Sequence, residues 1–154
     1  MPQAGMRDLN IFRILGSMTR EQMEEFDSLL EQVEFGTGDM IVEQGKKVDG
    51  MFFVLEGEVA VYRVTQGGGK VFLRTIHSGG QFGEVGLLEP GNRTATVQAS
   101  SPCKLLKLSG TKLGKLMQHP AIAAPFFHGL CRSLAIRVTG VSAQYAELVN
   151  SVSV

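Results

Sequence analysis

The chain has 154 residues, 44% of them hydrophobic, and its 15 basic and 15 acidic side chains cancel to a formal net charge of zero. This length is typical of one domain, and the hydrophobic fraction suffices for a buried core, so we expect residues 1–154 to form a single domain. Balanced charge argues against a nucleic-acid or anionic-membrane surface, and no apolar run approaches the roughly 20 residues that cross a bilayer.

An N-terminal helical segment is predicted over about residues 8–34. Thr19 can cap a helix that runs to about Val33, because polar residues fill the first turn after it. Apolar residues follow at helical spacing: Met23, Phe26, Leu29, Leu30 and Val33. The pattern predicts an amphipathic lid helix.

From about residue 35 to residue 109 the pattern changes to short apolar or alternating runs separated by glycine-containing turns. This pattern predicts an antiparallel sandwich or roll. The expected strands cover residues 40–42, 51–55, 59–64, 71–76, 94–99 and 104–108. The glycines at 67–69 are expected at a hairpin tip, because no helix or Lys-Ser/Thr pair of a phosphate loop follows them.

Two C-terminal helices are predicted over about residues 110–150. Residues 111–118 form the shorter one, and Pro120 suits the first position of the next. Pro125 falls inside the second pattern, where a proline removes one helical hydrogen bond. It indicates either a hinge or a static bend, and the sequence does not choose between them.

An apolar stripe runs along the second of these helices. Its residues recur at steps of three and four: Leu130, Leu134, Val138, Val141, Tyr145, Leu148 and Val152. Such a seam can pair with the same helix of a second copy, so we expect a homodimer through residues 130–152. The alternative is an amphipathic helix packed on its own domain. Gly140 weakens a long rigid coil by about 1 kcal/mol relative to alanine.

Residues 83–96, GEVGLLEPGNRTAT, are the most informative stretch. One helical turn over residues 83–88 would present unpaired N–H groups and a positive dipole end to an anion. Arg93 follows a Pro-Gly-Asn bend and can bind the same anion through bidentate bonds. Glu84 would repel an anion, so its carboxylate should accept a hydrogen bond from a sugar hydroxyl. A cyclic nucleotide carries both groups on one rigid ring.

This stretch closely resembles the phosphate-binding cassette of cyclic nucleotide-binding domains. Such domains occur in the bacterial catabolite-activator family, in regulatory subunits of cyclic-nucleotide-dependent kinases and in nucleotide-gated channels. The likeness rests on FGEVGLL at residues 82–88 and RTATV at residues 93–97, and extends over roughly residues 10–148. It implies a mainly β fold with flanking helices, namely an antiparallel double-stranded β-roll (jelly roll) with an N-terminal helix and a long C-terminal helix.

The resemblance also implies the binding residues. They are Gly83, Glu84, Val85, Gly86, Arg93, Thr94 and Ala95. Glu84 takes the ribose contact and Arg93 the phosphate contact, with Thr94 next to phosphate and base. In the catabolite-activator family the long C-terminal helix dimerises and covers the base. The polar residues that could reach the base are Arg132, Arg137 and Thr139.

The base itself is expected to be adenine. In relatives, a hydroxyl at the position of Thr94 can favour guanine, although related channels with threonine accept both bases. The C-terminal helices resemble those of the bacterial members of the family, and this resemblance favours cAMP over cGMP.

The sequence therefore predicts a sensor without catalytic activity, in which nucleotide draws the C-terminal helix over its base about Pro125. A ligand-free assembly domain of the same fold is the alternative, against which the Glu84 and Arg93 pair argues. A metal-dependent enzyme would need converging histidines and carboxylates, but the histidines form no HxH or HxxE pair. We expect no metal and no cofactor other than the ligand.

The setting is expected to be cytoplasmic. Cys103 and Cys131 have no metal-binding or CxxC spacing and lie among apolar neighbours, which predicts buried thiols in a reducing compartment. The first residues lack the pattern of a secretion signal. Transcription factors that resemble this domain continue into a DNA-reading unit, whereas few residues follow Asn150. We expect no DNA partner, and either a stand-alone sensor or a fragment.

Overall fold

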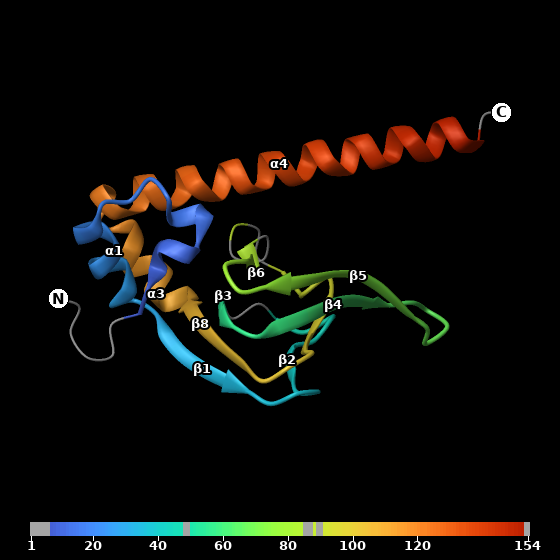
Figure 1. Ribbon diagram of the computed structural model, residues 1–154, viewed down its shortest axis with the longest axis horizontal. Coiled ribbons are helices and arrows are strands. Elements are labelled where there is room, and N and C mark those ends of the chain that lie inside the picture. Colours follow the sequence, from blue (N-terminus) through green and yellow to red (C-terminus); the bar gives the residue numbers. More distant parts are fainter. Residues whose placement is uncertain (1–6, 48–49, 85–87, 89–90, 153–154) are drawn as a thin grey trace.

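A computed structural model describes residues 7–47, 50–84, 88 and 91–152 (Figure 1). Its elements are η1 (Leu9–Ile11), η2 (Arg13–Leu15), α1 (Arg20–Asp27), β1 (Glu31–Phe35), β2 (Met40–Val42), β3 (Gly50–Glu56), β4 (Glu58–Val64), β5 (Lys70–His77), β6 (Gln81–Phe82), β7 (Thr96–Ala99), β8 (Cys103–Ser109), α3 (Gly110–Met117) and α4 (Pro120–Val152).

The strands form two antiparallel four-stranded sheets. One has the order β1-β8-β3-β6 and the other the order β2-β7-β4-β5. Apolar side chains of both sheets meet in a shared core that includes Val54, Val61, Val97 and Leu105. The predicted β-roll with an N-terminal helix and a long C-terminal helix is confirmed (Figure 1).

Strand β3 is buried on both of its faces, and this is what joins the helices to the roll. Successive side chains of a strand point to opposite faces. Phe52 and Val54 belong to the core between the sheets, while Met51 and Phe53 belong to a second core under the helices. There the ring of Phe53 packs edge-on against aromatic rings of the helical segments, at centroid distances of 5.2 Å for Phe12 and 5.9 Å for Phe26.

Helix α1 begins as predicted but is shorter. The Thr19 hydroxyl accepts from the backbone N–H of Gln22, and the Thr19 backbone N–H donates to the Gln22 side chain, which makes a reciprocal cap. The helix ends at Asp27, so the expected continuation to Val33 is wrong. Residues 31–35 pair with β8 instead, because antiparallel pairing places Val33 opposite the buried Leu105.

The predicted hairpin tip is confirmed. The backbone N–H of Thr65 donates to the Gly69 carbonyl across the turn between β4 and β5, at 2.8 Å. Of the two thiols, Cys103 is buried as expected, and burial raises its pKa. Cys131 is exposed, so its predicted burial is wrong. Its apolar sequence neighbours lie on the other side of the helix, where Leu130 is buried.

Helix α4 begins at Pro120 as predicted and continues as one helix through Pro125. Its first turns are anchored in the helical core by Ile122, Phe126 and Leu130. The later part of the stripe is exposed, and the exposed fraction reaches 67% at Tyr145. The alternative that the whole stripe packs on its own domain is therefore wrong. In Figure 1 the helix runs the length of the molecule and ends beyond the tip of the β4–β5 hairpin.

No helix within the described ranges is long and apolar enough to cross a membrane.

The anchoring of α4 depends on the absence of a side chain at Gly129. A Cβ atom there would lie 1.7 Å from the backbone carbonyl oxygen of Ile14, whereas a Cβ at Gly140 would meet nothing within 4 Å. We expect Gly129→Ala to lower the free energy of unfolding by about 2–3 kcal/mol, because η2 and α4 must separate. Gly140→Ala is the matched control and should leave stability unchanged or raise it by up to about 1 kcal/mol. Urea unfolding of both variants measures the difference, and equal stabilities would contradict this account of the contact.

Candidate functional site

A cavity of about 400 Å³ lies between the second sheet, the segment after β6 and α4, and its volume is within the usual range for small-molecule sites. Its lining residues are Val42, Val61, Leu73, Arg74, Phe82, Gly83, Glu84, Gly91, Asn92, Arg93, Thr94, Ala95, Val97 and Arg137. The structure thus brings five of the predicted binding residues into one cavity. The other two, Val85 and Gly86, lie outside the described residues.

Glu84 is a buried carboxylate with only 1% of its surface exposed. Its Oε1 atom accepts a hydrogen bond from the Arg137 guanidinium of α4. Its Oε2 atom is also buried and has no hydrogen-bond partner among the described residues. Because a buried carboxylate oxygen without a donor is energetically costly, this atom is an acceptor that a ligand hydroxyl would satisfy.

Arg93 is held by the loop between β2 and β3 on the other side of the cavity. Its backbone N–H donates to the Lys46 carbonyl at 2.6 Å, and its own carbonyl accepts from the N–H of Gly45 at 2.8 Å. The guanidinium donates to the Gly50 carbonyl, and the residue is 8% exposed. Bonds from both backbone and side chain therefore fix the position of this cation.

Gly83 allows the Arg93 guanidinium to lie against the backbone. Its φ angle is +89°, a conformation that favours glycine. A Cβ atom at this position would lie 2.5 Å from Nη1 of Arg93 and 3.0 Å from the Gly50 carbonyl oxygen. Position 83 therefore favours glycine for two reasons: the backbone angle suits glycine, and a side chain would collide with the Arg93 guanidinium.

Of the three residues on α4 that could face the base, the structure brings only Arg137 into the cavity. Arg132 lines a different cavity near η2. Thr139 is exposed, and its hydroxyl donates to the Ala135 carbonyl one turn earlier in the helix. The contact between Arg137 and Glu84, which are 53 positions apart, was not anticipated from the sequence.

Arg74 of β5 is a second cavity residue that sequence reasoning missed. Partial burial lowers its pKa, the nearby Arg137 lowers it further, and Glu84 raises it. The signal in the sequence was a single arginine inside the apolar run VFLRTI. With it, the described lining carries three guanidinium groups and a single carboxylate, a balance that favours an anionic ligand.

Within the described ranges, no group of three or more histidine, cysteine, aspartate and glutamate side chains is placed to hold a metal ion.

The roll, its long helix and a cavity that pairs a buried carboxylate with a fixed guanidinium have the form of a ligand-binding module. The family model described as "Cyclic nucleotide-binding domain" matches residues 32–119, and the chain belongs to this family.

Curated relatives include two kinds of regulatory protein. The chain is 30% identical over 109 residues to the cAMP-activated global transcriptional regulator CRP of Pasteurella multocida, covering 70% of this chain and 51% of the relative. It is 27% identical over 104 residues to a cAMP-dependent protein kinase regulatory subunit of Blastocladiella emersonii, covering 68% of this chain and 26% of the relative. The match thus spans from about a quarter to about half of the length of these relatives.

Solved structures agree with this assignment. The Thermus thermophilus catabolite activator protein is 25% identical with a TM-score of 0.78, covering 89% of this chain and 63% of that one. The N-terminal domain of a Streptomyces coelicolor transcriptional regulator is 28% identical with a TM-score of 0.74, covering 84% of this chain and 94% of that one.

The packing of Arg93 on Gly83 can be tested against a glycine of the same backbone conformation. Gly38 also has a φ of +89°, but a Cβ atom there meets nothing within 4 Å. We expect Gly38→Ala to cost about 1–2 kcal/mol of stability, the usual penalty for a left-handed residue. Gly83→Ala should cost about 2 kcal/mol more, because it also breaks the charged hydrogen bond from Arg93 to Gly50. Thermal unfolding compares the two variants, and equal losses would refute the packing role.

Proposed function

We propose that the chain is a sensor without catalytic activity that binds a 3′,5′-cyclic nucleotide in the cavity between Glu84 and Arg93. The observation that carries the proposal is the buried Oε2 atom of Glu84, an acceptor without a described donor beside a fixed guanidinium. An assembly domain without a ligand would have no use for a buried charge of this kind, which is expensive to maintain.

Each part of the ligand has a complementary surface. The ribose 2′-hydroxyl donates to Oε2 of Glu84, and the cyclic phosphate accepts from Arg93. Thr94 and Ala95 lie beside these two contacts in the same lining. The base then lies against the apolar wall formed by Val61 and Val97. The names of the relatives support cAMP as one ligand of this site.

Ligand binding is coupled to α4 through Glu84. The carboxylate already accepts from Arg137 through Oε1, so a ribose hydroxyl at Oε2 completes its hydrogen bonding without displacing the helix. The bound state therefore favours α4 over the cavity, whereas in the free protein the part of the helix beyond the anchored Leu130 departs more easily. The bend expected at Pro125 would instead have to pull Phe126 and Leu130 out of the helical core. The ligand can shift this equilibrium only by its difference in affinity for the two states.

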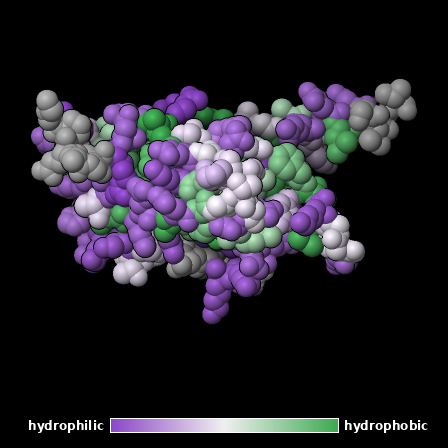
Figure 2. All heavy atoms as spheres, turned by 60° about the horizontal axis from the view of Figure 1, so that its bottom comes forward, coloured by the Kyte–Doolittle hydropathy of each residue, from purple (hydrophilic) through white to green (hydrophobic). Residues whose placement is uncertain are grey.

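The output of the sensor is the geometry of a homodimer formed by α4. The stripe that continues beyond Leu134 includes Val138, Val141, Tyr145 and Leu148, all of them exposed. A seam of this spacing is buried when two such helices pair. Figure 2 shows hydrophobic surface on the outer part of α4 and beside the β4–β5 hairpin.

The phosphate contact is tested by replacing Arg93. We expect Arg93→Ala to weaken the binding of cAMP about a hundredfold, a loss of about 3 kcal/mol, because the buried phosphate would lose its charged partner. Arg93→Lys keeps the charge but loses the planar fork, so it should give an intermediate affinity. Arg63→Ala, at an exposed arginine of β4, is the control and should bind as the unchanged chain does. Isothermal calorimetry measures the affinity of all three variants for cAMP, and unchanged binding by Arg93→Ala would refute the proposal.

The dimer seam is tested by placing one charge on α4 at two positions. Val141→Glu puts a carboxylate in the stripe, and we expect it to convert the dimer to a monomer because the charge would be buried. Ala143→Glu places the same charge on the opposite side of the helix and should leave the dimer intact. Sedimentation equilibrium measures the masses, and a dimeric Val141→Glu would exclude this seam.

A further inference from the structure

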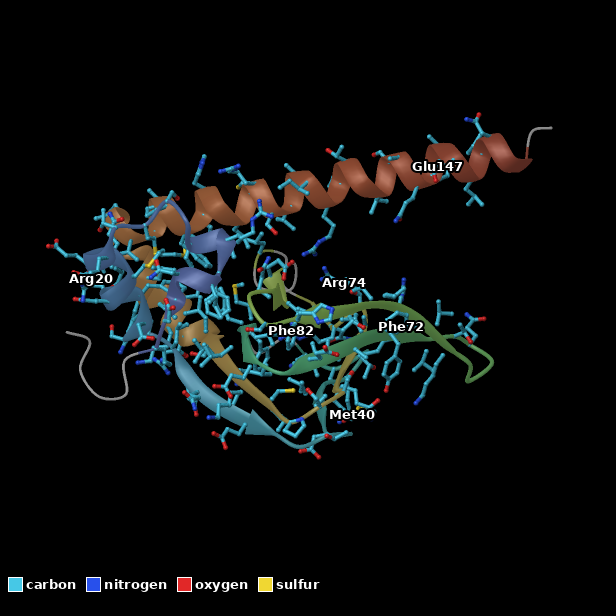
Figure 3. The ribbon with its side chains drawn as sticks, viewed as in Figure 1. Arg20, Met40, Phe72, Arg74, Phe82 and Glu147 are labelled. Atoms are coloured by element: carbon cyan, nitrogen blue, oxygen red, sulfur yellow. The ribbon has the colours of Figure 1, made fainter. Side chains whose placement is uncertain are left out.

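Each sheet of the roll has an edge strand on the side away from α4. Among the described strands, β1 pairs only with β8, and β2 pairs only with β7. A cavity of about 300 Å³, which we call the edge cavity, lies between β1 and β2. Among the described residues it meets the cavity of Glu84 only at Val42 and Arg93, which line both. Figure 1 shows β1 and β2 opposite α4, and Figure 3 places Met40 of β2 on the same side.

Two side chains of β1 form one wall of the edge cavity. Val33 lies opposite Leu105 of β8, and Phe35 lies opposite Cys103. Leu105 and Cys103 are both buried in the core between the sheets, so Val33 and Phe35 face the same way. Both remain half-buried, because β1 is an edge strand. The apolar interior of the sandwich thus continues to its open edge.

A β-bulge in β2 turns a further apolar side chain toward the edge cavity. Met40 lies opposite Gln98 and Val42 lies opposite Val97, so Ile41 is an extra residue. In a regular strand, Ile41 and Val42 would point to opposite faces. Here both pack against the core between the sheets, and both line the edge cavity. Together with Phe52, the side chains of β1 and β2 give this cavity an apolar floor.

Positive charges surround the apolar floor. The charged residues among the described lining are four basic ones and one acidic one, namely Lys46, Lys47, Arg93, Lys107 and Glu43. The carboxylate of Glu43 is 3.5 Å from the ammonium of Lys46, in an exposed pair. The ammonium of Lys107 lies 5.9 Å from the ring centroid of Phe52, at the floor of the cavity. Because the chain as a whole has no net charge, this excess is local, and its field favours an anionic group.

The lining suits a ligand that is charged at one end and apolar along its length. No neutral polar side chain occurs among the described lining residues, so a sugar or a base would find few side-chain partners for its hydrogen bonds. We propose that the edge cavity binds an unbranched alkyl carboxylate, with its chain on the apolar floor and its carboxylate among the basic groups. This site goes beyond the nucleotide site proposed above and does not depend on it.

Calorimetry on the unchanged chain tests the class of ligand. Dissociation constants are measured for hexanoate, octanoate and decanoate at concentrations below micelle formation. We expect each added CH₂ group to tighten binding about threefold to fourfold, because burial of one CH₂ group contributes about 0.8 kcal/mol. Decylamine has a chain of similar length but a cationic head, and it should bind at least about tenfold more weakly than decanoate. Affinities that do not rise with chain length, or equal affinities for decanoate and decylamine, would refute the proposal.

Charge reversal at the rim tests the place of the carboxylate. We expect Lys46→Glu to weaken the binding of decanoate about tenfold, because an attraction is replaced by a repulsion. Lys115→Glu, at an exposed lysine of α3, makes the same change in net charge and is the matched control, which should bind as the unchanged chain does. Equal weakening by both variants would mean that only the total charge matters. An unaffected Lys46→Glu would leave this lysine as a guard of the sheet edge, and either result would overturn the assignment.

Methyl NMR spectra test the place of the alkyl chain. We expect decanoate to shift the methyl signals of Ile41 and Val33 and to leave that of Ile122, in the helical core, unchanged. The largest shift at Leu73, which lines the cavity of Glu84 and not the edge cavity, would place the chain in the wrong cavity and refute the proposal. No nucleotide is present in these experiments. A chain that binds cAMP but not decanoate would therefore contradict the edge site alone.

Discussion

The contact between Glu84 and Arg137 is the interaction on which the arrangement of the site depends. A carboxylate with 1% exposure has lost its hydration, so it must be compensated by donors from the protein or from a ligand. The donor comes from a helix 53 positions away in the chain, and this makes the position of α4 part of the electrostatics of the cavity. Only one of the two carboxylate oxygens is satisfied among the described residues, so the helix and a ligand hydroxyl can share the same group.

Arg137 also lies at the point where α4 passes from buried to exposed surroundings. Before it, the helix is fixed by Leu130 in the helical core and by the close approach of Gly129 to Ile14. After it, the apolar stripe faces solvent, and Tyr145 is 67% exposed. In the proposed mechanism, a change in the charge balance around Glu84 therefore acts at the boundary between an anchored segment and an exposed one. The same displacement of Arg137 has little effect on the buried turns but a larger one on the outer turns, which lie further from the anchor.

The sequence predicted the features that depend on local pattern. Alternation and glycine spacing located most of the strands, and Thr19, Pro120 and the glycines before β5 acted as their local chemistry predicts. Residues 31–35 were misassigned because helical spacing at Leu29, Leu30 and Val33 coincided with a strand whose burial is decided by pairing with β8. The contribution of Arg74 depends on a bulge, which is a relation between two strands and has no signature in one of them. The choice of Arg137 over Arg132 and Thr139 likewise depended on the direction of α4 across the roll.

The cavity is lined by parts of the fold that differ in how firmly they are held. Arg93 is fixed by bonds to the backbone at Lys46 and Gly50, beside a strand buried on both faces, so the proposed phosphate contact has a rigid support. Arg74 stands on β5, an edge strand with one neighbour, and Arg137 on a helix that is largely exposed at that point. A substitution at Arg93 disturbs contacts beside the core, whereas one at Arg74 or Arg137 alters a more exposed wall of the cavity. On the proposed function, the surroundings of the ligand in this part of the cavity can therefore change without loss of the fold or of the proposed phosphate contact.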